Sequence, residues 1–371
     1  MTLTEPLYAD APSNSNGAAY VPGALAPSLT EQSAPEETTK QMVRRLAAHC
    51  QNYRGAVLHR ALWQMASTLM PLALMVVVMF ALADIAYWAV LLLAIPAGGL
   101  MVRVFIIQHD CGHGSFFKSR ELNDNVGRLM SILTLAPYGL WRREHAQHHA
   151  SSGNLDRRGS GDIDTLTVAE YQALSPLQKL RYRFYRHPLF LFGFGVPAYF
   201  LIVQRTPWLH ALPARDCFKS VIGLNIAMAL VYGPLFYAFG FAKVLSVFVP
   251  MVVVASATGG WLFFIQHQFE DTVWEKTNGW DFQVAALLGS SFYDLPKVLN
   301  WFTGNIGLHH IHHLNSMIPN YRLQDCIAAS AELRSINRLT LRESLKCAGL
   351  KLWDENRGRM ISFKEAEGGI R

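Results

Sequence analysis

Histidine is the residue type in this chain whose number and spacing could support chemistry. Fourteen histidines are present, and ten of them fall into four tight groups. Residues three and four positions apart share one face of an α-helix. The motif H-D-C-G-H therefore places His109 and His113 together, and H-A-Q-H-H does the same for His145, His148 and His149.

A third motif, H-H-I-H-H, repeats the spacing of the second with His309, His312 and His313. His310 is rotated by about 100° from His309 on a helix, so we expect it to lie outside a joint site. His267 stands alone in the sequence, but it follows the last long apolar run and should lie level with the other groups.

Metal binding is the chemistry that best explains such a concentration of imidazoles. Protonated imidazoles repel one another, whereas a metal ion binds the neutral form through its lone pair. Eight or nine imidazoles exceed the four ligands of a tetrahedral zinc ion. They suit two octahedral ions with open positions, which favours redox-active iron over a closed structural metal. The chain contains neither Glu-x-x-His nor H-E-x-x-H, the signatures of carboxylate di-iron bundles and of zinc proteases.

The composition indicates that these groups are positioned by a membrane protein. Of the 371 residues, 51% are hydrophobic and 16% are charged, where soluble domains carry roughly 25% charged residues. The net charge of +6 is not accompanied by a nucleic-acid-binding motif, so we expect no nucleic-acid partner. Five cysteines without a C-x-x-C pair argue against a disulfide scaffold.

Four apolar runs are each long enough to cross about 30 Å of hydrocarbon as a helix. Short links join them into two hairpins, so the histidines that follow each hairpin face the same compartment. We predict an all-α integral membrane protein, with a helical cap that holds a histidine-rich di-metal site. The predicted spans are residues 62–82, 86–107, 218–241 and 245–265.

Two shorter apolar segments are predicted not to cross the membrane. Residues 188–203 are broken by Gly193, Gly195 and Pro197, and residues 132–140 are shorter still. If residues 188–203 crossed, the histidine groups would lie on opposite sides and could not form one site. We therefore interpret both segments as interfacial or re-entrant.

The distribution of charge predicts the orientation and the remaining domain limits. Ten basic residues fall on the histidine side, whereas the outer links contain only Lys243, so the histidines and both termini are expected in the cytoplasm. We predict a disordered tail at 1–40, an amphipathic helix from Lys40 to Arg60, a membrane domain at 41–330 and a cytoplasmic segment at 331–371. An odd number of cysteines and the lack of organelle signals favour a bacterial inner membrane.

The three motifs, in this order and with these membrane intervals, resemble the histidine boxes of the membrane fatty acid desaturase family. The resemblance extends from about Leu62 to Phe363. Two further segments, Phe264 to Trp274 and Gly304 to Tyr321, are similar to the acyl-lipid branch that includes the Δ12 (omega-6) enzymes.

The resemblance implies two iron ions, O2 as co-substrate and an acyl-lipid substrate that receives a cis double bond. No cytochrome-like His-Pro-Gly-Gly sequence is present, so a separate electron donor of the ferredoxin or cytochrome b5 type is expected. The implied metal ligands are His109, His113, His145, His148, His149, His267, His309, His312 and His313.

Ligating histidines also need hydrogen-bond acceptors for their free ring N–H groups. Asn305, four residues before His309, either reaches a metal through water or caps a helix. Phe263 occupies the position at which stearoyl-type desaturases place an asparagine. Six carboxylates lie near the boxes in sequence, and spacing does not choose among them: Asp110, Glu144, Asp162, Asp164, Glu270 and Asp271. We name Asp110, together with Asn305, as the candidates for supporting the ligands.

Two rival functions remain at this point. A hydroxylase or ketolase acting on an acyl chain, alkane or carotenoid would share the histidine boxes and the first hydrogen abstraction. A metal transporter or haem protein would place its ligands near the middle of the spans. The central turns of the four runs contain no His, Asp, Glu or Lys, which disfavours the second class.

Overall fold

The computed structural model describes residues 37–159, 162–209 and 214–368. The chain separates into a short unit, Met1–Thr38, and a large unit, Thr39–Arg371, and the large unit holds the elements described below. Most of the predicted tail at 1–40 lies outside the described residues. The large unit is mostly helical, which confirms the predicted fold class.

The helices and strands have the following limits. The long helices and those of the histidine motifs are α2 (Leu58–Leu82), α3 (Tyr87–His113), α4 (Arg120–Thr134), α5 (Tyr138–Ser151), α10 (Ala214–Phe239), α11 (Phe241–His267) and α14 (His309–Leu314). The other α-helices are α1 (Thr39–Gln51), α6 (Val168–Ala173), α7 (Pro176–Tyr185), α8 (Pro188–Phe190), α9 (Val196–Leu201), α12 (Phe282–Leu288), α13 (Lys297–Phe302), α15 (Asn320–Ala328), α16 (Leu341–Cys347) and α17 (Phe363–Ala366). Short 3-10 turns cover Leu155–Arg157, Val203–Arg205 and Pro207–Leu209, and a π turn covers Leu191–Gly195. The strands are β1 (Leu166–Thr167), β2 (Phe292–Asp294), β3 (Arg338–Thr340), β4 (Leu352–Asp354) and β5 (Arg359–Ile361).

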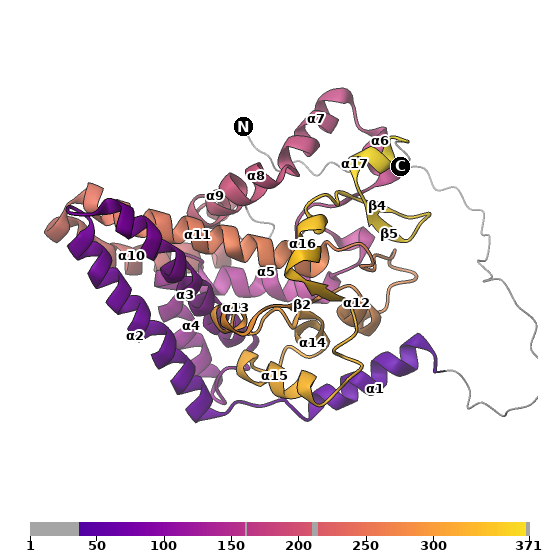
Figure 1. Cartoon of the computed structure of the whole chain (residues 1–371), viewed down its shortest axis with the longest axis horizontal. Coiled ribbons are helices and arrows are strands. Elements are labelled where there is room, and N and C mark those ends of the chain that lie inside the picture. The colour runs from indigo at the N-terminus through magenta and orange to yellow at the C-terminus, as the bar shows by residue number, and fades with distance from the viewer. Residues whose placement is uncertain (1–36, 160–161, 210–213, 369–371) are drawn as a thin grey trace, which may run out of the picture. The chain divides into compact units, whose positions relative to one another are not determined.

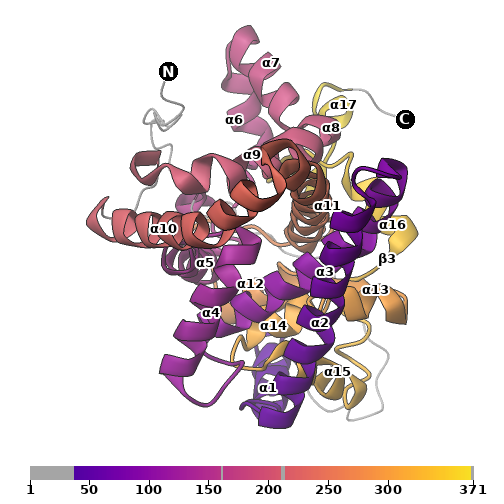
Figure 2. The ribbon, with the colours of Figure 1, turned by 90° about the vertical axis from the view of Figure 1, so that its left-hand side faces the viewer.

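Two antiparallel hairpins, α2–α3 and α10–α11, form the apolar part of the unit, with α3 packed between α2 and α11 (Figures 1 and 2). Gly98 permits the close approach of α3 to α11, because a Cβ there would lie 2.6 Å from the side chain of Val254. Lys243 and Asp84 join the turns of the two hairpins through a 2.6 Å ion pair. At their other ends, α3 and α11 continue beyond the predicted spans to His113 and His267. The helices that enter the membrane therefore also carry histidines of the site.

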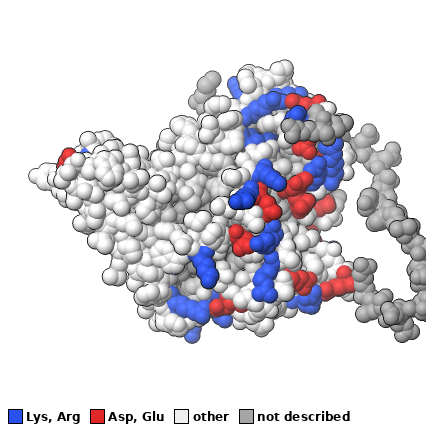
Figure 3. Space-filling model, in the orientation of Figure 1, with Lys and Arg blue, Asp and Glu red and all other residues white. Residues whose placement is uncertain are grey.

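The surface around the hairpins is apolar. On the face in Figure 3, charged side chains gather over the short helices and strands, and the surface along α2 and α11 is almost free of them. Leu74 and Leu230, for example, are 66% and 72% exposed. Exposed apolar surface of this extent, on helices long and apolar enough to cross a bilayer, is the pattern of a membrane protein. The protein is built as a multi-pass integral membrane protein.

Within the described residues, five helical segments, rather than the four predicted spans, are long and apolar enough to cross a membrane, and the additional one is Pro188–Arg205. Its contacts support the interfacial or re-entrant interpretation. Val196 meets Gly260, and Phe192 packs against Trp261 and Phe264, all near the histidine end of α11. The number of crossings stays a prediction.

Short helices and five strands form the cap beside the hairpins. The strands make one three-stranded sheet, β1-β4-β5, and one parallel pair, β2-β3. They were not predicted, because runs of two or three residues leave no periodic pattern. Residues 331–368 contribute β3, β4 and β5 to these sheets, so this part of the chain packs against the rest of the cap.

The predicted helix from Lys40 to Arg60 was wrong in its extent. Helix α1 ends at Gln51, and α2 has already begun at Leu58. The apolar face of α1, which includes Val43 and Leu46, is buried against the cap rather than open to lipid.

Candidate metal centre

The structure brings all nine predicted ligand histidines together, and it sorts them into two groups. The five-histidine group contains His109 and His113 from α3, His145 and His149 from α5, and His312 from α14. The four-histidine group contains His148 from α5, His267 from α11, and His309 and His313 from α14. Each histidine contributes one ring nitrogen, and within each group these nitrogens all lie within 4.8 Å of one another.

Local helix geometry accounts for the pairs inside these groups. Each motif contains an i, i+4 pair that stays together: His109 with His113, His145 with His149, and His309 with His313. The second and third motifs each have one further ligand candidate outside this pair. His148 lies in the four-histidine group, away from His145 and His149, and His312 lies in the five-histidine group, away from His309 and His313. Both α5 and α14 thus contribute to both groups and hold them next to each other.

The distances between ring nitrogens match those expected of ligands on a common ion. At a metal–nitrogen distance of about 2.1 Å, two ligands at right angles place their nitrogens about 3.0 Å apart. In the five-histidine group, the Nε2 atom of His145 lies 3.1 Å from the Nε2 atom of His113 and 3.1 Å from that of His149. In the four-histidine group, the Nε2 atoms of His267 and His309 are 3.0 Å apart, and those of His148 and His313 are 3.2 Å apart.

In three histidines, a hydrogen bond at Nδ1, the ring nitrogen that faces away from the group, fixes the tautomer. The Nδ1 of His109 donates to the Asp110 carboxylate at 2.9 Å, and that of His148 donates to the Asp162 carboxylate at 2.5 Å. The Nδ1 of His267 donates to the carbonyl oxygen of Gly289 at 3.2 Å. Because carboxylate and carbonyl oxygens only accept, each Nε2 carries a lone pair directed at its neighbours.

The surroundings favour neutral imidazoles. Burial lowers the pKa of five histidines outside the spans well below 6.5, and the neighbouring histidines lower it further; they are His145, His149, His309, His312 and His313. The Nε2 of His109 is buried without a hydrogen-bond partner among the described residues. Converging lone pairs and a buried nitrogen without a hydrogen-bond partner are suited to bind cations, so the two groups of nitrogen donors are compatible with two metal ions.

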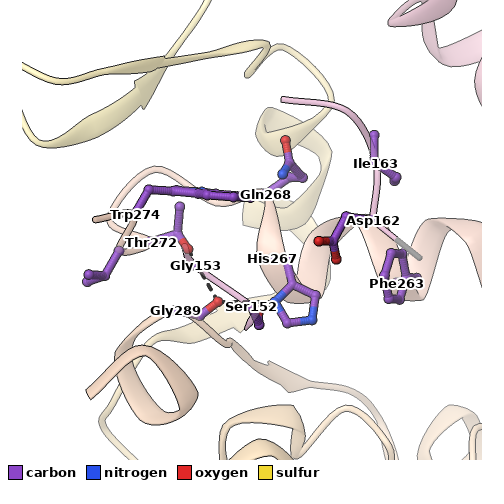
Figure 4. Close-up of a pocket in the computed structure, with 11 residues that line it drawn as sticks. Ser152, Gly153, Asp162, Ile163, Phe263, His267, Gln268, Thr272, Trp274 and Gly289 are labelled. Atoms are coloured by element: carbon purple, nitrogen blue, oxygen red, sulfur yellow. Dashed lines mark hydrogen bonds between the residues drawn. The ribbon is translucent and has the colours of Figure 1, made fainter. Parts of the chain in front are cut away.

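Figure 4 shows the edge of the four-histidine group. His267 and the carboxylate of Asp162 border a small cavity of about 10 Å³, space for about one water molecule, and Phe263 forms part of its wall. The ring of Phe263 lies 5.1 Å from that of His148. The position that carries an asparagine in stearoyl-type desaturases thus supplies an aromatic wall in this chain.

The five-histidine group borders a larger hollow of about 220 Å³, which His113, His145, Trp141 and Arg142 help to line. The indole of Trp141 stacks on the ring of His145 with centroids 4.6 Å apart. The sequence analysis did not identify Trp141, because one aromatic residue on a helix has no distinctive spacing.

The two positions proposed to support ligands differ in their contacts. Asp110 contacts His109 and also accepts hydrogen bonds from the backbone and side-chain nitrogens of Asn320. Asn305 has a left-handed backbone (φ 59°), and its amide donates to the Asn320 carbonyl at 3.2 Å. Asn305 therefore reaches Asp110 through Asn320.

The structure also distinguishes among the carboxylates that sequence left equivalent. Asp162 contacts a histidine of the centre, whereas Glu144 accepts from Tyr199 and Gln204 of the 188–205 segment. Glu270 pairs with Arg359 of β5. Nothing in the local sequence around Asp162 distinguished it from the others, and the carbonyl of Gly289 was missed entirely.

His310 lies outside both groups, as its rotation on the helix predicted. Its Nε2 contacts the carbonyl of Leu333 at 2.9 Å, and its ring stacks on Phe292. Burial lowers the pKa of His310 to about 4. It therefore joins α14 to the cap as a neutral side chain.

A family model described as fatty acid desaturase matches residues 86–335, which include all nine histidines of the two groups. The chain belongs to the fatty acid desaturase family. The protein is therefore a membrane fatty acid desaturase, an oxidoreductase of the histidine-box class.

Three relatives place this desaturase more closely. A fatty acid desaturase of Bacillus subtilis is 38% identical over 336 residues, which cover 91% of this chain and 94% of the relative. An sn-1 acyl-lipid omega-3 desaturase (ferredoxin) of Synechocystis is 30% identical over 244 residues, 61% of this chain and 63% of the relative. An sn-1 oleoyl-lipid 12-desaturase of Anabaena variabilis is 27% identical over 309 residues, 79% of this chain and 81% of the relative. The similarity to a Δ12 enzyme is thus distant and is shared with omega-3 enzymes.

Proposed function

We propose that the nine histidines bind two iron ions and that the enzyme introduces a cis double bond into an acyl chain of a membrane lipid. The observation that carries the proposal is the convergence of nine imidazoles into two groups with ring nitrogens 3.0–3.2 Å apart. Nitrogen-only ligands and ligand sets of five and four suit a redox-active metal with open positions.

The residues of the chain would hold, orient and shield the reacting centre. When bound, the two ions would supply the O2 activation that removes hydrogen from two adjacent carbons. Asp110, Asp162 and the Gly289 carbonyl hold protons on the Nδ1 atoms of three histidines, so that their Nε2 lone pairs face the centre. Loss of two hydrogens, together with two electrons and two protons, balances the reduction of one O2 to two waters.

Aromatic side chains next to the histidines support an apolar substrate. Trp141 lies against His145, and Phe263 lies against His148 and His267. A methylene chain has no polar group at the reacting carbon, so walls of this kind have to position it. These aromatic rings would form the walls along which an acyl chain reaches the two histidine groups.

The position of the double bond, the donor and the orientation complete the proposal. We propose Δ12 (omega-6) desaturation of a lipid-linked monounsaturated chain, on the resemblance to the 12-desaturase relative. A separate ferredoxin-type or cytochrome b5-type protein would supply the electrons, and three relatives carry ferredoxin in their names. The basic residues on the histidine side support a cytoplasmic centre in a bacterial inner membrane.

The test is the fatty-acid profile of a bacterial host that supplies ferredoxin and expresses this chain or its His312→Ala variant. Gas chromatography with mass-spectrometric localisation should reveal a new Δ9,12 diene that the variant does not make. A new double bond elsewhere would overturn the Δ12 assignment alone. A hydroxylated or ketonic product would overturn desaturation in favour of an oxygenase.

A further inference from the structure

Helix α7 carries an apolar stripe that the protein leaves open. Leu177, Leu180 and Phe184 are 57%, 63% and 59% exposed. At 100° per residue they lie within about 60° of one another around the helix. On the opposite face, Tyr182 is buried against the cap. An open apolar stripe on a helix whose opposite face is anchored by a buried tyrosine indicates a contact with something outside the chain.

The position of α7 in the chain indicates what that contact is. Two residues separate the end of α7 from the segment Pro188–Arg205, which is apolar enough to enter a membrane. Leu189 and Phe194 of this segment are 79% and 61% exposed. In both ribbon views α7 lies at the edge of the large unit, immediately beyond α8 and α9 (Figures 1 and 2). The stripe thus lies next to the exposed apolar surface of a segment that is apolar enough to enter a membrane.

Basic residues flank the stripe. Arg181 is exposed next to it, and Arg183 and Lys179 lie toward its other side. Lys179 and Arg183 also hold the helix on the cap: Lys179 donates to the carbonyl of Gln172, and Arg183 pairs with Glu367. An apolar stripe with basic flanks is the pattern of a helix that lies in a bilayer interface, where arginine reaches the lipid phosphates.

We propose that α7 is an interfacial helix that inserts Leu177, Leu180 and Phe184 into the headgroup region of a phospholipid bilayer. The occupant of the stripe is the lipid surface. This site is distinct from the metal centre, and the inference does not depend on which metal or substrate the enzyme uses.

The other face of α7 would connect this lipid contact to the metal centre. The Tyr185 hydroxyl accepts a hydrogen bond from the backbone nitrogen of Asp164 at 3.2 Å. Arg186, which follows the helix and is fully buried, donates to the Asp164 carbonyl at 2.8 Å. Two residues earlier, Asp162 accepts from His148. One helix therefore contacts lipid on one side and holds the segment that orients a histidine on the other.

The test measures the depth of α7 in a bilayer with the full-length protein. A Leu180→Cys variant, labelled with the fluorophore NBD, is placed in nanodiscs of phosphatidylcholine and phosphatidylglycerol. The five native cysteines are buried, and the labelled parent protein gives their background. Glu355→Cys, at an exposed position in the β4–β5 turn, is the matched control.

The expected result is that lipid carrying a nitroxide near the headgroup end of its acyl chain quenches the Leu180→Cys probe about twofold or more, while aqueous iodide quenches only the Glu355→Cys probe. Phe184→Cys should repeat the behaviour of Leu180→Cys. Quenching of both stripe probes by iodide would place α7 in water and overturn the proposal. Protection from both quenchers would indicate a protein partner, such as a second copy of the chain, and would overturn it equally.

Discussion

The five-histidine and four-histidine groups share two helices, α5 and α14, but differ in burial and in support. All four residues of the smaller group are buried, whereas His113, His145 and His149 of the larger group are only half-buried. The larger group has one more imidazole and borders the larger hollow. In the smaller group, Asp162 and the Gly289 carbonyl fix two of the four rings.

On the proposed function, the two groups would therefore bind their ions in different ways. The larger group has more donors and an accessible side, which suits contact with species from outside. The smaller group has fewer donors, but burial and hydrogen bonds restrict the motion of its rings. Pre-oriented ligands lose less conformational freedom when they bind an ion. Substitutions at matched positions in the two groups should therefore perturb each group separately.

Removing one ligand from each group should have the largest effect. His312 and His313 are neighbours on α14 but belong to different groups, so His312→Ala and His313→Ala form a matched pair. Each should lower product formation by at least about 100-fold, because the proposed reaction needs both ions. Metal analysis of the purified variants should show that each loses about one of two ions per chain. Normal product from either variant would break the two-group interpretation.

Removing the supporting carboxylates should have an intermediate effect. Asp162→Ala should weaken metal binding in the four-histidine group about 10–100-fold, as measured by competition with a chelator. Asp162→Asn should retain much of the binding, because its amide oxygen still accepts from His148. Equal losses for the two variants would indicate that the negative charge matters more than ring orientation.

Asp110→Ala tests the corresponding support of the five-histidine group. It should weaken metal binding by a similar factor, because His109 loses its acceptor. It should also lower the free energy of unfolding by roughly 1–3 kcal/mol, because two buried donors of Asn320 lose their partner. Thermal unfolding of metal-free protein separates the two effects. An unchanged melting temperature would contradict the structural part of this expectation.

The smallest effect on the centre should come from His310, which lies in the same motif but in neither group. His310→Gln removes the stacking on Phe292 and disturbs the contact with Leu333. It should reduce stability by roughly 1–3 kcal/mol while the metal content stays at two ions per chain. Loss of metal comparable to that of His313→Ala would mean that His310 takes part in the centre.

Much of the centre could be predicted from the sequence, because its organisation is local. The i, i+4 spacing of His109 with His113, or of His309 with His313, fixes which side chains share a helix face. Long apolar runs fix which segments can enter a membrane, and their short links make hairpins. The membrane class, the mostly helical fold and the histidine pairs within each motif follow from these two patterns, whereas the full set of nine ligands, with the isolated His267, rested on the family resemblance.

The partition of the histidines depends on tertiary packing. His148 and His149 are adjacent in sequence and about 100° apart on α5, so they point toward different neighbours. Only the packing of α5 with α3, α11 and α14 decides that His149 joins the first motif and His148 joins His267. Tertiary packing also decides that Asp162 contacts His148 and that the Gly289 carbonyl contacts His267. Periodicity along one helix specifies faces, whereas the pairing of faces is a long-range property of the folded chain.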